Sequence, residues 1–431
     1  MDYFPVIVLV FSFIALLSIG TPVAWSISIS SVLTMLVSIP SLPALTTVSQ
    51  RMGTGLDSFA LLAIPFFILS GQLMNKGGIA HRLIAFAKTL VGSLPGGLAL
   101  INVIGAMLMG AIAGSAMASA SAMGSILGPE MEKEGYSKEF GAAVNITSAT
   151  TGLVIPPSNV LIVYSLASGG VSIAALFLAG YIPGILTGLF LMLVASFWAK
   201  KKKYKQGERS SLKEVTKTFI AALPSLMLLV VVIGGIVSGI FTATEASAIA
   251  VLYTLLLGFY YKEITFKSLP EILLDSSSTT AVVMLLIGAS MSMSWVMSYE
   301  NIPQDISSAL LSISDNKIVI LLIINLLLLF VGIFMDMTPA VLIFTPIFLP
   351  VVTKLGMDPI HFGIIMVLNL CIGLCTPPVG SVLFVGVGVA QTTIQKVVKP
   401  LVPLFLAMIV ALFLVTYFPE LTLWLPRLFN L

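Results

Sequence analysis

Two similar hexapeptides decide the fold of this chain: Gly152-Leu153-Val154-Ile155-Pro156-Pro157 and, 221 residues later, Gly373-Leu374-Cys375-Thr376-Pro377-Pro378. The same offset relates five further pairs, which are Pro129 and Pro350, Gly135 and Gly356, Ile173 and Ile394, Thr21 and Thr242, and Ser26 and Ser247. Matches in several separate regions at one offset predict an internal repeat. We therefore divide the chain into two homologous halves, 1–199 and 218–431, joined by a linker at 200–217.

The composition is strongly apolar. Of 431 residues, 58% are hydrophobic and only 9% are charged, and the mean hydropathy is +1.11. A soluble domain has about 25% charged residues, so these values exclude a soluble or a disordered chain. Two cysteines exclude a disulfide scaffold, and a net charge of +3 excludes a nucleic-acid binder. The predicted class is an all-α polytopic protein of the lipid bilayer.

Apolar stretches mark the membrane passages, each of which needs about 20 residues. They are 4–38, 57–75, 96–132, 138–168, 172–199, 218–240, 242–261, 279–298, 317–353, 360–390 and 399–419. The first is too long for a removable signal core and follows no basic residue. Because adjacent prolines break a helix, we interpret 138–168 and 360–390 as discontinuous helices and 96–132 and 317–353 as re-entrant hairpins. The reverse assignment within each pair stays open, and about ten crossings result.

The basic residues predict the topology. The linker holds eight of the 21, and we interpret it as a cytoplasmic loop rather than a specific lipid site. With five crossings in each half, both termini are periplasmic and the two repeats are inverted. This arrangement puts 17 basic residues on the cytoplasmic side and four on the periplasmic side, as the positive-inside rule requires.

Signatures of enzymes are missing from the sequence. It has no H-E-x-x-H, no nucleotide-binding P-loop and no G-x-S-x-G, and its two histidines, His81 and His361, lie in different halves. Cys371 and Cys375 share a helix face, but two thiols make a poor metal site and small core residues are the simpler interpretation. We therefore predict neither an enzyme nor a nucleotide cofactor.

The interrupted elements are the predicted functional site. Non-helical backbone in a membrane is tolerated only where it is buried in protein or lines a cavity, and paired interruptions in inverted halves indicate a transporter's binding site. Freed carbonyls can bind Na⁺, and helix N-termini can bind an anion. Glycine pairs such as Gly110 and Gly114 alone would indicate only close packing. The predicted substrate-binding residues are Ser119, Asn145, Ser148, Ser158, Asn159, Asn369 and Ser381.

Two acidic residues lie within apolar stretches. Asp336 falls at the predicted tip of the second hairpin, 221 residues after Ser115, where a carboxylate is costly and usually functional. It can serve as a cation ligand, as a helix N-cap, or as both. Glu245 follows Thr242 with the spacing of a capping box, so we predict a structural role for it.

One segment resembles a known family. Phe59-Ala60-Leu61-Leu62-Ala63-Ile64-Pro65-Phe66-Phe67-Ile68-Leu69-Ser70-Gly71, followed by Asn75-Lys76-Gly77-Gly78-Ile79, is similar to the large membrane subunit of tripartite ATP-independent periplasmic (TRAP) transporters, as are 152–159 and 373–381. The resemblance implies a Na⁺-coupled elevator importer of organic acid anions, such as C4-dicarboxylates or sialic acid, in the bacterial inner membrane. It also implies a small four-helix membrane subunit, here expected on a separate chain, and a periplasmic substrate-binding protein.

The resemblance also implies two Na⁺ sites, at 113–119 with 150–157 and at 332–339 with 373–380. The residues carried over are Gly114, Ser115, Thr150, Gly152, Pro156, Gly332, Asp336, Thr338, Gly373, Thr376 and Gly380. Because Ser115 stands where the second half has Asp336, the two sites differ chemically. We expect 96–168 and 317–390 to form a mobile transport block. The alternatives are an ion antiporter, a non-transporting anchor subunit of a larger complex, and a membrane enzyme.

Overall fold

The computed structural model describes residues 3–205, 207, 209–314 and 316–431, and every regular element in these ranges is helical. Eight helical segments among them are long and apolar enough to cross a membrane: Phe59–Lys76, Ile173–Lys202, Leu212–Val237, Ala243–Tyr260, Leu269–Tyr299, Lys317–Phe334, Met337–Lys354 and Ile394–Tyr417. Many large apolar side chains on the outside are exposed, including Phe197 and Phe330. Lipid is the solvent that such a surface fits. The predicted class, an all-α polytopic membrane protein, is confirmed.

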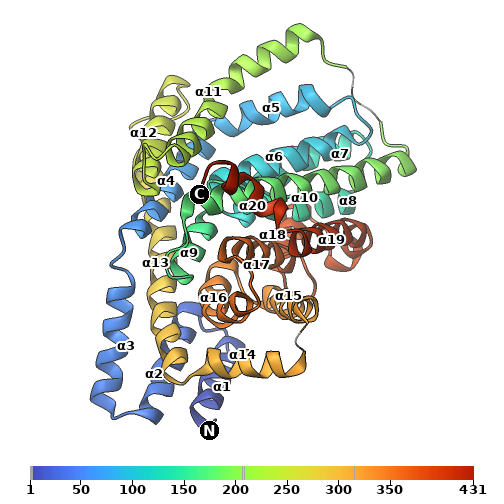
Figure 1. The fold of residues 1–431 in the computed structure, drawn as a ribbon. Coiled ribbons are helices and arrows are strands. Elements are labelled where there is room, and N and C mark those ends of the chain that lie inside the picture. Colours follow the sequence, from blue (N-terminus) through green and yellow to red (C-terminus); the bar gives the residue numbers. More distant parts are fainter. Residues whose placement is uncertain (1–2, 206, 208, 315) are drawn as a thin grey trace.

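One group of helices forms a body that we call the frame (Figure 1). Its members are α1 (Phe4–Ser18), α2 (Val23–Ser38), α3 (Ser41–Gly55), the 3₁₀ turn η1 (Phe59–Leu62), α4 (Ala63–Lys76), α11 (Leu212–Val237), α12 (Ala243–Tyr260) and α13 (Leu269–Tyr299). Within it α4 packs against α12, and the long helix α13 packs against α2, α3 and α4. The frame thus takes helices from both halves of the chain.

The other helices form a second body, which we call the block. They are α6 (Gly97–Ala113), α7 (Ala116–Lys133), α8 (Lys138–Thr151), α9 (Asn159–Ala167), α10 (Ile173–Lys202), α15 (Lys317–Phe334), α16 (Met337–Lys354), α17 (Pro359–Gly373), α18 (Ser381–Val389), α19 (Ile394–Tyr417) and α20 (Glu420–Leu428). Here α10 packs against α6, α17 and α19, and α19 packs against α8. The sequence placed 172–199 and 399–419 outside the block, whereas these contacts favour including α10 and α19 in it.

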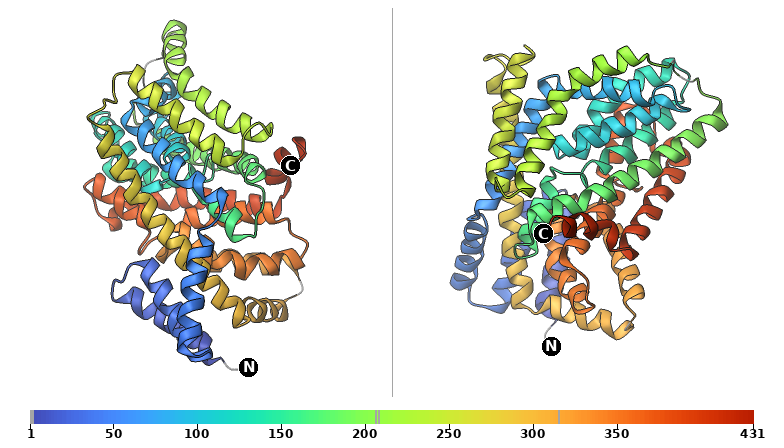
Figure 2. Two further views of the ribbon diagram at one scale, coloured as in Figure 1. Left: turned by 90° about the vertical axis from the view of Figure 1, so that its left-hand side faces the viewer. Right: turned by 45° about the horizontal axis from the view of Figure 1, so that its top comes forward.

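Two amphipathic helices, α5 (Ile79–Val91) and α14 (Ile302–Ile313), connect the frame to the block (Figure 2). Helix α5 packs on α11 through the rings of Phe86 and Phe219, whose centroids are 5.4 Å apart, and reaches α7 through an ion pair between Lys88 and Glu130. Helix α14 packs on α16, where Lys354 Nζ donates to Ser307 Oγ at 3.4 Å. Each connector therefore touches the second helix of one predicted hairpin.

Glycine pairs let the helices of the block cross closely. A Cβ built on Gly152 would stand 2.5 Å from Gly110 Cα, and a Cβ built on Gly373 would stand 2.5 Å from Gly332 Cα. In each half, the first helix of the predicted hairpin therefore crosses the first part of the interrupted helix, backbone against backbone. The two crossings lie at the interruptions and fix the position of the non-helical segments.

Candidate functional site: a cavity between the block and the frame

A cavity of about 510 Å³ lies between the block and the frame. On the side of the block, its wall comes from the tips of the two predicted hairpins and from the breaks in the two interrupted helices. On the side of the frame, its wall comes from α4 and α13. Among the residues that line it are four predicted cation-site residues, Gly114, Ser115, Asp336 and Thr338, and one predicted substrate-binding residue, Asn159. Segments more than 200 residues apart in the sequence therefore meet at one site.

The two hairpin tips differ in how they are capped. Helix α6 ends at Ala113, Gly114 follows with φ +60°, and Ser115 Oγ accepts a hydrogen bond from Ala118 N at 3.3 Å at the start of α7. In the second half, Asp336 occupies the N-cap position of α16, but its side chain makes no capping hydrogen bond. The Asp336 carboxylate thus retains acceptor capacity for a further partner, and it is the one charged group among the described residues that line the cavity.

Four helices point their N-termini at this cavity. The first turns of α7, α9, α16 and α18 contribute Ala116, Asn159, Met337 and Val382 to its lining. The N-terminus of a helix carries a partial positive charge and unpaired N–H groups. Four such ends around one space make it favourable for an anion without a lysine or an arginine in the wall.

The helix C-termini at the same interruptions supply oxygen atoms. The hydroxyls of Thr150 and Thr376 donate to the carbonyls of Thr147 at 3.1 Å and of Ile372 at 2.8 Å. Thr150 Oγ1 also lies 3.5 Å from Cys375 Sγ, and neither threonine is among the described residues that line the cavity. Gly152 and Gly373 stand at the glycine crossings, each next to its partner Gly110 or Gly332. Gly380 has φ +48° and donates its N–H to Ile333 O at 3.0 Å, and the Pro156–Pro157 peptide bond is cis.

Several predicted substrate-binding residues point elsewhere. Ser119 Oγ donates to Ala106 O at 3.1 Å, Ser148 Oγ donates to Val144 O at 2.6 Å and contacts Asn102 Oδ1 at 3.2 Å, and Ser158 Oγ donates to Leu153 O at 2.6 Å. These three side chains are buried. Ser119 and Ser148 join α7 and α8 to α6, and Ser158 bonds within the segment between α8 and α9. Their hydrogen bonds stabilise the structure around the break, and their side chains do not line the cavity.

The other three predicted residues also lie outside the lining of this cavity. Asn369 Nδ2 donates to Asn325 Oδ1 at 2.8 Å and joins α17 to α15 in the core. Asn145 lines a different, smaller cavity. Ser381 follows Gly380 at the start of α18, and its Oγ has no hydrogen-bond partner among the described residues.

The frame wall contains polar residues that the sequence analysis missed. Gln72 and Asn75 lie one turn apart on α4, and Ser278 and Thr279 face them from α13. The available signal was the run of hydroxyls at 276–280 within an otherwise apolar helix. This run lies outside the interrupted elements, so the sequence did not mark it as part of the site. A substrate in the cavity would touch both bodies.

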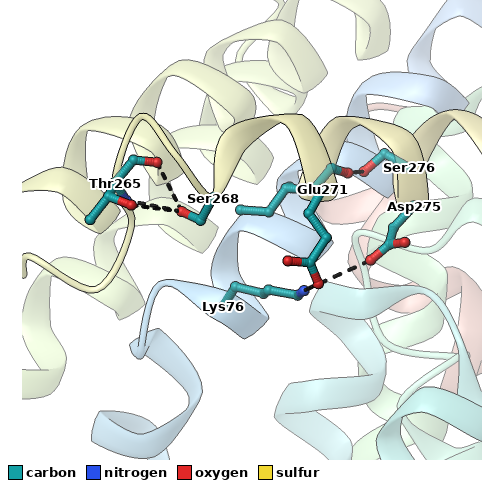
Figure 3. A network of polar contacts seen from close by, with 7 residues as sticks. Lys76, Thr265, Ser268, Glu271, Asp275 and Ser276 are labelled. Atoms are coloured by element: carbon teal, nitrogen blue, oxygen red, sulfur yellow. Dashed lines mark hydrogen bonds and ion pairs between the residues drawn. The ribbon is translucent and has the colours of Figure 1, made fainter.

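An ion-pair network lies beside this frame wall (Figure 3). Lys76 Nζ, next to Asn75, is 2.6 Å from Glu271 Oε1 and 3.8 Å from Asp275 Oδ2. One ammonium thus faces two carboxylates, all of them substantially exposed. The network joins α4 to α13 within the frame.

Glu245 forms the predicted capping box with Thr242 at the start of α12, so its structural role is confirmed.

Several known proteins similar to the chain are named as transporter subunits. Residues 10–421 match the family model described as tripartite ATP-independent periplasmic transporter, DctM component. The chain is 39% identical over 432 residues to the C4-dicarboxylate TRAP transporter large permease protein DctM of Rhodobacter capsulatus, covering 97% of this chain and 98% of that one. It is 38% identical over 421 residues to the sialic acid TRAP transporter large permease protein SiaM of Vibrio cholerae, with the same two coverages.

A solved structure shares the fold. The crystal structure of the YdaH transporter of Alcanivorax borkumensis matches with a TM-score of 0.66 at 13% sequence identity, covering 88% of this chain and 89% of that one. At this identity the match concerns the arrangement of helices alone. The family model and the relatives, which are named as transporter permease subunits, confirm that the chain is a multi-pass membrane transporter subunit and not an enzyme.

Proposed function

The chain belongs to the DctM family of tripartite ATP-independent periplasmic transporters, and from this premise we propose that it is the large permease subunit of a Na⁺-coupled importer of organic acid anions. The observation that carries the proposal is the convergence of four helix N-termini on one cavity between two bodies. That electrostatic environment suits a carboxylate. The names of the relatives, which refer to C4-dicarboxylates and sialic acid, support the same chemical class.

The oxygen donors at the interruptions fit Na⁺, a hard cation that prefers oxygen ligands. Ser115 and Thr150 with the carbonyls near Gly152 would hold one ion, and Asp336, Thr338 and Thr376 with the carbonyls near Gly373 would hold the second. The uncapped carboxylate of Asp336 supports this assignment. A bound cation supplies positive charge beside the anion, which couples the binding of the two. The chain's own contribution is to hold these oxygens in place through the two glycine crossings.

The division into two bodies supports an elevator motion. The cavity lies at their boundary, so a block that slides against the frame would carry the block wall with it and leave α4 and α13 behind. Helices α5 and α14 suit the role of connectors that accommodate the movement. We include α10 and α19 in the moving block because of their packing on α17 and α8.

The same proposal covers partners and orientation. A separate small membrane subunit of four helices would dock on the frame, whose exposed apolar surface is extensive, and leave the block free to move. A periplasmic binding protein would deliver the substrate. Both termini would be periplasmic and the basic linker Lys200–Lys217 cytoplasmic, in the bacterial inner membrane.

Uptake in proteoliposomes that contain the chain, its small subunit and its binding protein tests the proposal. We expect uptake of a radiolabelled organic acid anion to require an inward Na⁺ gradient and no ATP. Asp336→Asn should weaken the dependence on Na⁺ strongly, whereas Glu245→Gln, a change in a helix cap, should leave it unchanged. Uptake that persists without Na⁺ would refute the coupling, and equal effects of the two variants would refute the role of Asp336.

A further inference from the structure

The two walls of the cavity between the block and the frame differ chemically. The four helix N-termini that favour an anion, those of α7, α9, α16 and α18, all belong to the block. The frame contributes Gln72 and Asn75 from α4 and Ser278 and Thr279 from α13, together with apolar side chains. None of the described lining residues from α4 or α13 is charged. The two ends of a bound molecule would therefore meet different surroundings.

The polar side chains of the frame wall are available to a ligand. Gln72 and Asn75 are partly exposed, and Ser278 and Thr279 are exposed. The side chains of Gln72, Asn75 and Ser278 make no hydrogen bond to another described residue. Thr279 Oγ1 donates to Asp275 O at 2.9 Å and retains acceptor capacity. Because amides and hydroxyls both donate and accept, this wall suits a ligand that carries hydroxyl groups.

A second carboxylate would be disfavoured at the frame wall. Gln72 and Asn75 lie in the last two turns of α4, whose C-terminus carries a partial negative charge. The ammonium of Lys76, which follows Asn75, already faces Glu271 at 2.6 Å and Asp275 at 3.8 Å (Figure 3). One cation beside two carboxylates leaves an excess of negative charge there. That excess repels an anionic group and leaves a neutral hydroxyl unaffected.

The size of the cavity favours the same kind of ligand. Its volume is about 510 Å³. Pockets of about 300–1,000 Å³ are those that take drug-sized ligands. A four-carbon acid fills only a small part of such a space. An acid with a longer, hydroxylated chain fills more of it and brings hydrogen-bonding groups to the frame wall as well as to the block wall.

We propose that the cavity selects organic acids with one carboxylate and a neutral, hydroxylated chain, such as sugar acids, over dicarboxylates. The carboxylate binds at the helix N-termini of the block, and the hydroxyls of the chain form hydrogen bonds with Gln72, Asn75 and Ser278. These three side chains thereby determine specificity. The inference rests on the proposed function, because it takes an anion in this cavity as given, and it adds the chemical class of that anion.

Cysteine protection tests this inference in the purified full chain in detergent, with Na⁺ present throughout. Met117 on α7 and Val282 on α13 line the cavity and are exposed, so Met117→Cys and Val282→Cys report its occupancy from opposite walls. The native thiols Cys371 and Cys375 are buried, which keeps the background low. We expect D-gluconate to slow modification by a charged thiol reagent at both positions. Succinate, hexanoate, which lacks hydroxyls, and sorbitol, which lacks a carboxylate, should each need clearly higher concentrations.

Variants of the frame wall separate selectivity from binding as such. Gln72→Leu and Asn75→Leu nearly keep the side-chain size and remove the hydrogen bonds. Each should raise the concentration of gluconate needed for half-maximal protection about two- to tenfold, as the loss of a hydrogen bond or two predicts, and leave that of hexanoate unchanged. Gln50→Leu, at an exposed position of α3 outside the cavity lining, is the matched control and should change neither.

The outcomes distinguish this inference from the proposed function. Equal protection by succinate and gluconate would overturn the inference and leave the proposed function in place, and loss of the succinate effect in Lys76→Gln would assign the second carboxylate to that ammonium. Gluconate protection that is unchanged in both leucine variants would also overturn it. Protection by none of the acids at either reporter would instead contradict the anion site on which the proposed function itself rests.

Discussion

Replacing Gly373 by alanine would disturb the structure at the interruption of the second half. The new Cβ would stand 2.5 Å from Gly332 Cα, 2.6 Å from its carbonyl carbon and 3.0 Å from its carbonyl oxygen. These are backbone atoms, so no flexible side chain can move aside. Since ordinary contact begins at about 3.4 Å, α15 and α17 must separate by roughly 0.9 Å.

Overpacking of this kind costs about 1–3 kcal/mol. Alanine in a helix interior is favoured over glycine by ~1 kcal/mol, but Gly373 is the last residue of α17, where that gain is small. We therefore expect Gly373→Ala to destabilise the protein by about 1–2 kcal/mol. Because the crossing positions the carbonyls at 374–376, the concentration of Na⁺ needed for half-maximal uptake should rise several-fold.

The matched control is Gly234→Ala in α11, where a built Cβ meets no atom within 4 Å. That variant should be as stable as the wild type or slightly more stable. Both are measured by reversible unfolding of the purified chain in mixed detergent micelles and by uptake titrated with Na⁺. Equal stability of the two variants would show that the crossing relaxes freely. A stability loss without any change in Na⁺ dependence would refute the link between the crossing and the cation site.

Three further predictions concern the topology, a helix cap and the motion of the block. A cysteine at Lys213 should react with an impermeant thiol reagent in inside-out vesicles and not in intact cells. The reverse pattern would refute the predicted topology. Glu245→Gln should lower stability by about 1 kcal/mol or less, measured by the same unfolding assay, because it weakens one capping box on an exposed helix end. A cysteine cross-link between α13 and α16, which pack together across the boundary of the two bodies, should stop uptake while the complex remains assembled. Normal uptake through the fully cross-linked protein would exclude the sliding block.

The breaks in the helices could be predicted from the sequence because their causes are local. Adjacent prolines lack the N–H groups that a helix needs, and the structure ends α8 at Thr151 and α17 at Gly373, a few residues before each pair. The tip of the first hairpin was visible as a run of small residues with Gly114 at its centre. The apolar composition likewise predicted a membrane protein.

The orientation of individual polar side chains could not be predicted in the same way. Ser119, Ser148 and Asn369 lie near the breaks, but each faces a neighbouring helix, because the crossings decide which side of a helix meets the cavity. Gln72 on α4 faces the cavity only because two halves of the chain pack together. Such facts depend on tertiary contacts, to which neither hydropathy nor spacing is sensitive.

The difference between Ser115 and Asp336 has a consequence for the membrane voltage. As a carboxylate, Asp336 adds one fixed negative charge to the block, and Ser115 adds none. In the proposed elevator, an empty block would carry this charge outward through the field of an interior-negative cell. Moving one elementary charge across the membrane is worth about 2.3 kcal/mol per 100 mV. The resting potential acting on this charge would thus speed the return of the unloaded carrier, and Asp336→Asn would remove that contribution.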